Sequence, residues 1–287
     1  MCYNPAILKK HCLKWQKKRE VFIMKKILVI MMAVLMLATT LCFASCGKDE
    51  ETLTVYTEAG FAPYEFVYEN EIVGVDIKIM EAVAEKLGKK LVVEDVNFDS
   101  IVGAVKTGKA DAGAAGITIT AERAEEVDFS IPYSSTEQYV IVKADNTAIT
   151  NLETMKGVKI GVQQGTTSDI LIEGLIKDGS LAGSTLTPYD APALAAAALG
   201  TKIDAVVTDK LTAEVIVASS NGAYKTFKLT KADGSDVAEV EKYGIAVSKG
   251  NKELLDVINE VLTELLANGS IAKWEQEYND LYATIEE

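Results

Sequence analysis

The chain has 287 residues, of which 29 are Lys or Arg and 42 are Asp or Glu, giving a formal net charge of −13. All four cysteines and the single histidine lie in the first 46 residues, which are basic, whereas residues 47–287 carry a net charge of −20. The body therefore lacks side chains for disulfides, Cys/His zinc sites and Ser-His or Cys-His nucleophile pairs, and its acidity argues against a nucleic-acid partner. No bound metal or cofactor is expected.

The N-terminal segment has the pattern of a secretory signal. Met24, Lys25 and Lys26 precede twelve apolar residues at 27–38, and small and polar residues follow as far as Cys46. Twelve apolar residues are too few for a comfortable membrane span, which needs about 20, although a retained transmembrane anchor is the alternative. We therefore expect residues 1–45 to comprise upstream sequence and a signal peptide starting at Met24, and residues 46–52 to form a tether.

From Leu53 onward, strand-length apolar runs alternate with helix-period segments, which predicts an α/β fold with mostly parallel sheets flanked by helices. In the first half, Gly88 is expected to end a helix. The predicted strands are 53–57, 91–93 and 111–117, and the predicted helices are 76–87 and 99–107.

A second series follows the first, with strands at 158–162, 185–187 and 205–207 and helices at 167–176 and 192–199. Both series contain a Gly at a helix end followed by Lys-x-Asp-Ala, at Asp111 and at Asp204. Such corners recur by chance, but a body of about 240 residues is itself long enough for two lobes of one architecture. A strand at 243–248 and helices at 252–266 and about 271–278 close the chain, with Trp274 and Tyr278 expected to pack in the core.

Ligand sites in such sheets lie beyond the carboxyl ends of the strands, so the loops there are the places to search. After the third strand, Thr120 is a plausible N-cap, which puts Arg123 at the third helical position, where the helix dipole opposes a cation. An arginine at that position makes sense if a carboxylate binds it. The alternative is a surface pair of Arg123 with Glu125 or Glu126.

Two further loops offer polar groups in the second series. Residues 163–169, Gln-Gln-Gly-Thr-Thr-Ser-Asp, follow a strand and open a helix, where free N–H groups suit a carboxylate, unless they serve capping alone. Asp209 ends a later strand, where it could meet a cation or cap the next helix. An arginine and helix amides for a carboxylate, an aspartate for an ammonium and aromatic residues nearby fit a zwitterion such as a free α-amino acid.

Several ordered motifs make the body resemble the polar amino-acid-binding proteins of ABC importers. They are Phe61-Ala-Pro-Tyr-Glu-Phe66, Val73-Gly-Val-Asp-Ile77, Gly108-Lys-Ala-Asp111, Ile117-Thr-Ile-Thr-Ala-Glu-Arg123, Val127-Asp-Phe-Ser-Ile-Pro-Tyr133, Gly165-Thr-Thr167 and Tyr243-Gly-Ile-Ala246. The resemblance implies a two-lobed periplasmic-binding-protein-like fold of type II with a two-strand hinge near 134–140 and just before Tyr243. Lobe 1 would comprise 53–135 and 243–287, and lobe 2 would comprise 139–240.

The resemblance also implies roles for individual residues. Arg123 would hold the α-carboxylate with amides of Thr118 and Thr167, while Asp209, the Gly116 carbonyl and the Thr118 hydroxyl would hold the α-ammonium. Phe61 and Phe98 would enclose the side chain, and Glu58, Gln163 and Thr166 would face its distal end. The expected ligand-binding set is Glu58, Phe61, Phe98, Gly116, Ile117, Thr118, Arg123, Gln163, Thr166, Thr167 and Asp209. Family members that bind basic amino acids have an acidic residue at the position of Glu58, and members that bind cystine can have one there too.

Ala44-Ser45-Cys46 resembles the lipobox of bacterial lipoproteins, with Phe43 where those proteins usually have Leu. Cys46 would then carry lipid, although it could also be an ordinary small residue of the signal. The resemblance implies a monomer outside the cytoplasm, anchored by lipid to the outer face of the cell membrane or periplasmic in a diderm, which delivers a free L-amino acid to an ABC permease and its ATPase.

Two other functions share this fold. A few members of the fold class are dehydratases of prephenate-like carboxylates, which need a general acid in the cleft, and Glu58 is the candidate here. A sensor could use the same pocket to report a ligand instead of delivering it, because fold does not fix function. The importer component is the favoured prediction, and no enzyme activity is expected.

Overall fold

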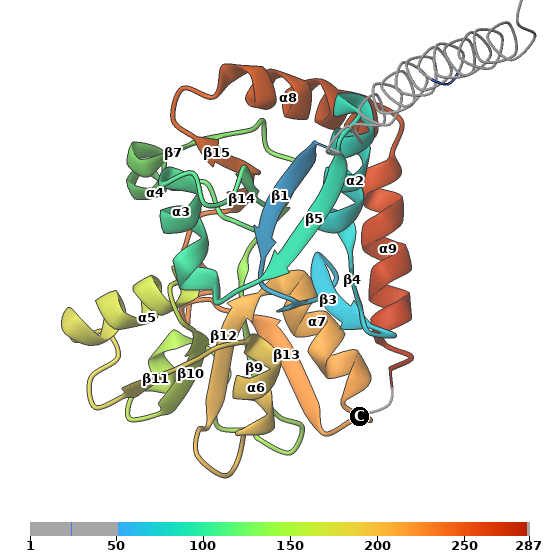
Figure 1. Ribbon diagram of the computed structural model, residues 1–287. Coiled ribbons are helices and arrows are strands. Elements are labelled where there is room, and N and C mark those ends of the chain that lie inside the picture. The colour runs from blue at the N-terminus through green and yellow to red at the C-terminus, as the bar shows by residue number, and fades with distance from the viewer. Residues whose placement is uncertain (1–23, 25–50, 286–287) are drawn as a thin grey trace, which may run out of the picture. The chain divides into compact units, whose positions relative to one another are not determined.

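The computed structural model describes Met24 and residues 51–285, and residues 51–285 belong to one compact unit (Figure 1). The predicted signal peptide, the lipidation candidate Cys46 and most of the tether lie outside the described residues and stay predictions. Among the helices in the described part of the chain, none has the length and apolar character needed to cross a membrane.

The first lobe is built on a sheet in the order β5-β1-β6-β15-β7. Neighbours β5, β1 and β6 are parallel, and β15 is antiparallel to both of its neighbours. The sheet strands are β1 (Thr52–Thr57), β5 (Lys90–Asp95), β6 (Ala112–Gly113), β7 (Val127–Phe129) and β15 (Ala246–Ser248). The helices are α2 (Val75–Leu87), α3 (Phe98–Lys106), α4 (Ala121–Glu126), α8 (Lys252–Ala267) and α9 (Ser270–Tyr282), and β2 (Gly60–Phe61), β3 (Glu65–Tyr68) and β4 (Glu71–Val73) form a small separate sheet.

The second lobe contains a sheet in the order β11-β10-β12-β9-β13. Here too three neighbouring strands are parallel, and one strand, β9, is antiparallel to both of its neighbours. Its strands are β9 (Gln138–Lys143), β10 (Lys159–Gln163), β11 (Thr185–Tyr189), β12 (Ala205–Asp209) and β13 (Tyr224–Lys228). The helices are η1 (Leu152–Met155), α5 (Thr167–Lys177), α6 (Pro192–Ala197) and α7 (Lys210–Ser219). The predicted two-lobed α/β fold is confirmed.

The repeated Lys-x-Asp-Ala corner has the same structure in both lobes. The Asp111 carboxylate accepts a hydrogen bond from the Thr54 amide at 2.8 Å, and the Asp204 carboxylate accepts one from the Lys159 amide at 3.0 Å. In each case the aspartate amide donates in return to the carbonyl of the same strand residue. The aspartates therefore fix two parallel strands in register, and the prediction of two units of one architecture is confirmed.

Local signals explain where the helices form. Helix α2 ends at Gly88, which adopts the left-handed conformation with φ 65° as predicted. Its residues Met80 and Val83 pack in the first sheet's core and Ile77 is also buried, and burying each such side chain contributes about 1.5–3 kcal/mol. Trp274 packs against the same core, as predicted.

Two predicted strands were too long. The strand expected at 111–117 is confined to Ala112–Gly113, because the chain turns at Gly116, which has φ +53°. The strand expected at 243–248 is interrupted at Gly244, because the chain leaves the hinge sheet after Tyr243 and joins the first lobe's sheet at Ala246.

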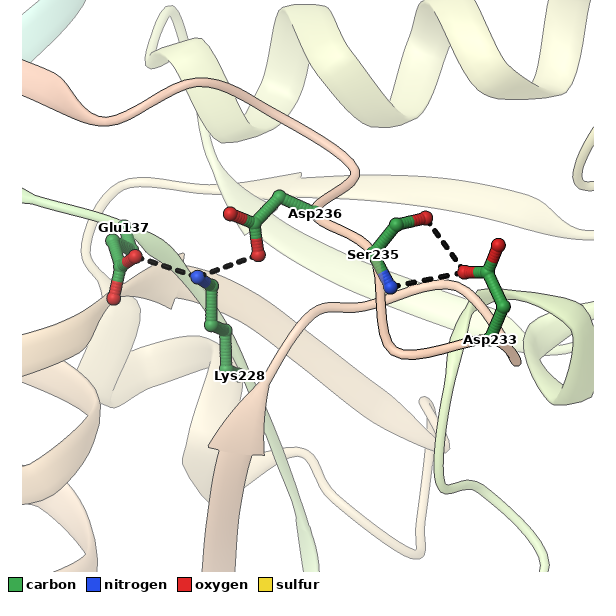
Figure 2. A network of polar contacts seen from close by, with 5 residues as sticks. All are labelled: Glu137, Lys228, Asp233, Ser235 and Asp236. Carbon is green, nitrogen blue, oxygen red and sulfur yellow. Dashed lines mark hydrogen bonds and ion pairs between the residues drawn. The ribbon is translucent and has the colours of Figure 1, made fainter.

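Two antiparallel strands connect the lobes, β8 (Ser134–Thr136) and β14 (Glu241–Tyr243). Beside them, the Lys228 ammonium lies 2.6 Å from a carboxylate oxygen of Glu137 and 2.6 Å from one of Asp236 (Figure 2). Glu137 follows β8, and Asp236 lies in the loop that leads to β14. Lys228, at the end of β13, therefore forms ion pairs with the segments that adjoin both hinge strands.

The C-terminal helix α9 contacts α2 and α8 of the first lobe and α7 of the second (Figure 1). Where it approaches α7, Val215 of the second lobe packs in one apolar cluster with Phe66 of the first lobe and Tyr278. The lobes thus share an apolar contact in addition to the hinge strands.

Candidate ligand-binding site

A small cavity lies between the two lobes at the carboxyl ends of their strands. It is lined by nine of the eleven residues predicted from the sequence, namely Phe61, Phe98, Gly116, Thr118, Arg123, Gln163, Thr166, Thr167 and Asp209. Its volume is about 10 Å³, whereas small-molecule sites measure roughly 300–1,000 Å³. The lobes are therefore closed tightly on one another, and an amino acid could enter only if they moved apart.

Arg123 reaches across this cavity from the first lobe. Thr120 caps α4 by accepting the Arg123 amide, as predicted, and the guanidinium donates to the carbonyls of Thr118 at 2.8 Å and Gly165 at 3.0 Å. It also lies over the Phe98 ring, 5.3 Å from the centroid. Burial lowers the pKa of Arg123, while the charges of Glu241 and Asp209 oppose this effect. An arginine side chain in a protein stays protonated, so Arg123 is a cation.

Among the described residues, Arg123 forms no ion pair with its predicted alternative partners Glu125 and Glu126. A carboxylate oxygen of Glu126 lies 2.5 Å from Nζ of Lys106, and the Arg123 guanidinium donates to the carbonyls of Thr118 and Gly165. The surface pair is therefore not the arrangement in this structure.

Asp209, at the end of β12, lines the same cavity as Arg123 and is 7% exposed. Its carboxylate accepts hydrogen bonds from Gln138 Nε2, at 2.9 Å, and from the hydroxyl of Tyr243. Although Asp209 occupies the N-cap position of α7, its side chain makes no capping bond, so the capping alternative is wrong. Burial raises the pKa of Asp209 to about 7, the nearby charge of Glu241 adds to the rise, and the two hydrogen bonds and Arg123 oppose it.

Glu58, the predicted distal residue, lies next to the cavity and not in its lining. Its carboxylate accepts a hydrogen bond from Gln163 Nε2 at 2.7 Å, which joins the two lobes, and Gln163 also donates to the Asp190 carbonyl. Burial raises the pKa of Glu58 to about 7, and the charges of Asp95 and Asp190 raise it further against the effect of Gln163. This end of the site is acidic.

The loop before α5 combines capping with a place in the cavity. Thr166 caps the helix by accepting the Asp169 amide, and its hydroxyl donates to the Gln163 carbonyl. The neighbouring Thr167 does not cap, because its hydroxyl donates to Glu241 at 2.7 Å. Capping alone, the alternative considered for this segment, therefore does not account for it.

The aromatic wall depends on a glycine. Gly116 has φ +53°, and a Cβ at this position would lie 2.8 Å from the Phe61 ring, so only glycine fits. Phe61 itself lies against Tyr64 and Tyr243, with ring centroids 6.1 and 6.4 Å away. Ile117, predicted as a site residue, instead places its side chain in the first lobe's core and is 1% exposed.

Three polar residues around the site were missed in the sequence. Glu241 and Tyr243 come from the hinge strand β14, and Gln138 opens β9 beside it. They bond to one another or to predicted residues: Gln138 Nε2 lies 3.0 Å from Glu241 and 2.9 Å from Asp209, and the Tyr243 hydroxyl donates to Asp209. A buried glutamine at the start of an otherwise apolar strand was the one signal available for Gln138. Nothing local to Glu241 pointed to the cavity.

The site thus presents a cation and a carboxyl group from opposite lobes, with two phenylalanine rings and an acidic end. A family model for bacterial extracellular solute-binding proteins, family 3, matches residues 53–280. The chain belongs to this family. Its membership agrees with the resemblance found in the sequence motifs.

Other family 3 relatives and structures agree in length and fold. The arginine-binding extracellular protein ArtP of Bacillus subtilis (strain 168) is 28% identical over 262 residues, covering 89% of this chain and 98% of ArtP. The structure of an ancestral arginine-binding protein bound to arginine is 40% identical, with a TM-score of 0.70, covering 80% of this chain and 98% of that one. The ancestral amino acid-binding protein AncCDT-1, described as a precursor of cyclohexadienyl dehydratase, is 33% identical with a TM-score of 0.68, covering 79% and 95%.

Proposed function

We propose that this family 3 protein is the substrate-binding component of an amino-acid ABC importer, which captures a polar free L-amino acid between its lobes and delivers it to a membrane permease and its ATPase. The observation that carries the proposal is the pair Arg123 and Asp209, which line one cavity from different lobes. A guanidinium suits the α-carboxylate and a carboxylate suits the α-ammonium. The named function of ArtP supports the same class of ligand.

Capture would use lobe closure. The ligand's carboxylate would bind Arg123 and backbone amides at Thr118 and Thr167, and its ammonium would bind Asp209 and the Gly116 carbonyl. Phe61 and Phe98 would cover the aliphatic part of the side chain. Because these groups belong to both lobes, the closed form has the full set of contacts and is the form expected to meet the permease.

The acidic end of the site supports a preference for a cationic side chain. Glu58 lies beside Gln163, and the charges of Asp95 and Asp190 act on it. A guanidinium or ammonium there would pair with Glu58 and relieve the repulsion among the three carboxylates. The two arginine-binding relatives described above are consistent with this preference.

A thermal-shift screen of the purified protein against all common L-amino acids tests the main proposal. A ligand at 100 times its Kd stabilises the fold by about 2.7 kcal/mol, or roughly 5–10 °C in Tm for a protein of this size. Arg123→Ala should abolish the shift, while Lys109→Ala, which removes an exposed cation of the same lobe, should retain it. A full ligand shift in folded Arg123→Ala protein would contradict the assignment.

The preference has its own test. L-arginine or L-lysine should raise the Tm more than glutamine, histidine or cystine, and Glu58→Gln should weaken arginine binding by roughly tenfold or more while changing glutamine binding little. If glutamine or cystine gives the largest shift in the wild type, Glu58 does not select for cations.

The boundaries and the anchor are part of the same proposal. Lobe 1 comprises 53–135 and 243–287, lobe 2 comprises 139–240, and a lipid on Cys46 holds the monomer to the outer face of the membrane, or in the periplasm of a diderm. Metabolic labelling with a fatty acid should mark the wild type, and Cys46→Ser should lose both the label and membrane association. Labelling that persists in Cys46→Ser would contradict lipidation there.

A dehydratase is the second candidate, favoured by one observation. Glu58 is a buried carboxyl group with a pKa near 7, as a general acid requires, and AncCDT-1 is described as a precursor of a dehydratase. Incubation with prephenate-like carboxylates should give no product if the binding function is correct. Turnover that Glu58→Gln abolishes would favour the enzyme instead.

A further inference from the structure

Glu241 of the hinge strand β14 is bonded to both lobes through a single oxygen. Its Oε2 accepts a hydrogen bond from the Thr118 hydroxyl of the first lobe at 2.8 Å and from the Thr167 hydroxyl of the second lobe at 2.7 Å. Its other oxygen, Oε1, accepts from Gln138 Nε2 at 3.0 Å, at the start of strand β9 of the second lobe. The carboxylate is thus held at three points.

These bonds lie at the boundary between two cavities. Thr118 and Thr167 line the small cavity that contains Arg123 and Asp209, and they also line a second cavity of about 550 Å³ on the hinge side. Glu241 lines only the second cavity, together with Val240. The carboxylate and the two hydroxyls therefore close the hinge side of the small cavity.

The charge of Glu241 acts on the groups expected to bind a zwitterion. Its negative charge stabilises the Arg123 cation and raises the pKa of Asp209. A carboxylate that accepts hydroxyl hydrogen bonds beside a guanidinium has the surroundings that an amino acid's own carboxylate would require. A ligand carboxylate bound to Arg123 and the backbone amides of Thr118 and Thr167 would lie close to Glu241, whose Oε2 is bonded to the hydroxyls of the same two threonines. The two negative charges would then repel each other.

We propose that Glu241 is an internal carboxylate that latches the two lobes together through Thr118 and Thr167, and that an incoming amino acid must displace it. The latch sets how often the cleft opens and opposes binding, because ligand contacts replace contacts the protein already makes. The displacement step rests on the proposed function, whereas the latch itself does not.

The latch can be tested in protein dialysed free of amino acids, without any binding assay. In the full chain with its four cysteines replaced by serine, spin labels at Lys109→Cys and Lys202→Cys report the distance between the lobes by pulsed electron paramagnetic resonance. Glu241→Gln and Glu241→Ala should broaden the distribution toward longer distances, with the larger effect for alanine. The control Glu239→Gln removes the same charge from an exposed neighbour that lines the same outer cavity, and it should match the wild type.

The displacement is tested by calorimetric titration of the same variants with L-arginine. Glu241→Gln should lower the Kd by roughly fivefold, and Glu239→Gln should leave it near the wild-type value. Distances that do not change in folded Glu241→Ala protein would overturn the latch, and a Kd that rises in Glu241→Gln would overturn displacement. If no amino acid binds the wild type, the proposed function fails while the distance measurement still decides the latch.

Discussion

Arg123 of the first lobe donates a hydrogen bond from Nη2 to the carbonyl oxygen of Gly165 in the second lobe at 3.0 Å. The loop can come this close because Gly165 has no side chain: a Cβ there would lie 2.7 Å from Cβ of Asp99. The residue proposed to hold the ligand's carboxylate therefore also helps to close the cleft. A ligand must replace the bonds that the site residues now make between the lobes. The protonation state of each site residue therefore affects the affinity for the ligand.

Asp209 makes ligand affinity depend on pH. Its pKa in the protein is about 7, and pairing with an ammonium would lower it, so binding releases a proton at and below neutral pH. Affinity for glutamine, whose side chain is neutral, should rise from pH 5 to pH 8, by up to roughly 100-fold when each pKa unit counts as tenfold. Titration calorimetry in buffers of different ionisation enthalpy measures both the Kd and the proton release.

Asp209→Asn is the control for this effect. It should bind weakly and show no proton release for glutamine, because asparagine cannot ionise. Arginine should give a steeper pH dependence than glutamine in the wild type, since Glu58 also has a pKa near 7 and would pair with its side chain. A glutamine Kd that is constant across this pH range would show that Asp209 does not take the ammonium.

Much of the fold could be predicted from the sequence because its signals are local. Helix α2 shows an apolar face and a terminal Gly88, and the corners at Asp111 and Asp204 repeat within the chain. The overlong strand at 111–117 shows the limit. Small apolar residues there are compatible with a strand, but the turn at Gly116 is required by the Phe61 ring, which is distant in sequence.

The site divides in the same way. Residues beyond strand ends, such as Arg123 and Asp209, could be found because parallel strands bring their carboxyl ends to one edge. Gln138 and Glu241 could not, since their contact joins positions 103 residues apart and forms only when the start of β9 lies beside the hinge strand β14. The motif at 117–123 predicts Ile117 as a site residue, but a motif does not show which way a side chain points, and this one lies in the core.

The buried carboxyl pair Glu65 and Asp76 should make stability depend on pH. Both are fully buried in the first lobe, where Asp76 Oδ2 accepts bonds from the Gly116 amide and the Tyr133 hydroxyl. The Glu65 carboxyl lies within hydrogen-bond reach of Asp76, and this contact raises the pKa of Glu65 and lowers that of Asp76. Burial, followed by the charge of Asp76, raises the pKa of Glu65 well above its usual value, so Glu65 is the protonated member of the pair.

Because the folded-state pKa of Glu65 is raised, its contribution to stability is present below about pH 4.5 and is lost as pH rises through the folded pKa. Burial also raises the pKa of Asp76, to about 7, which acts in the same direction between pH 4 and 7. Glu65→Gln, which cannot ionise, should reduce the decline in Tm between pH 5 and pH 8 and exceed the wild type by roughly 5 °C at pH 8. Exposed Glu71→Gln is the matched control; parallel pH curves for the wild type and Glu65→Gln would contradict the assignment.

Lys228 should affect hinge motion more than stability. Its ion pairs with Glu137 and Asp236 are partly exposed, so Lys228→Met should change the Tm little (Figure 2). The loop between β13 and β14 should open more often, which hydrogen exchange of the Lys231 amide, bonded to the Ser235 carbonyl, would report as a faster rate. Lys225→Met, on the same strand without these ion pairs, should exchange as the wild type does. Equal rates in all three proteins would mean that the ion pairs do not restrain the hinge.

Gly116 should tolerate no side chain, for two separable reasons. Its φ of +53° costs any L residue about 1 kcal/mol, and a Cβ would also press on the Phe61 ring at 2.8 Å. Gly108 has φ +72° but open space around it, so Gly108→Ala pays the backbone cost alone. Chemical denaturation should therefore show Gly116→Ala to be less stable than Gly108→Ala by about 1–3 kcal/mol, as for overpacked cores.

Gly116→Ala should also lose ligand binding, because Phe61 must shift into the cavity or away from it, whereas Gly108→Ala should bind normally. Equal stability of the two variants would mean that the Phe61 ring moves aside freely, and the wall of the site would then be less rigid than its packing against Tyr64 and Tyr243 indicates.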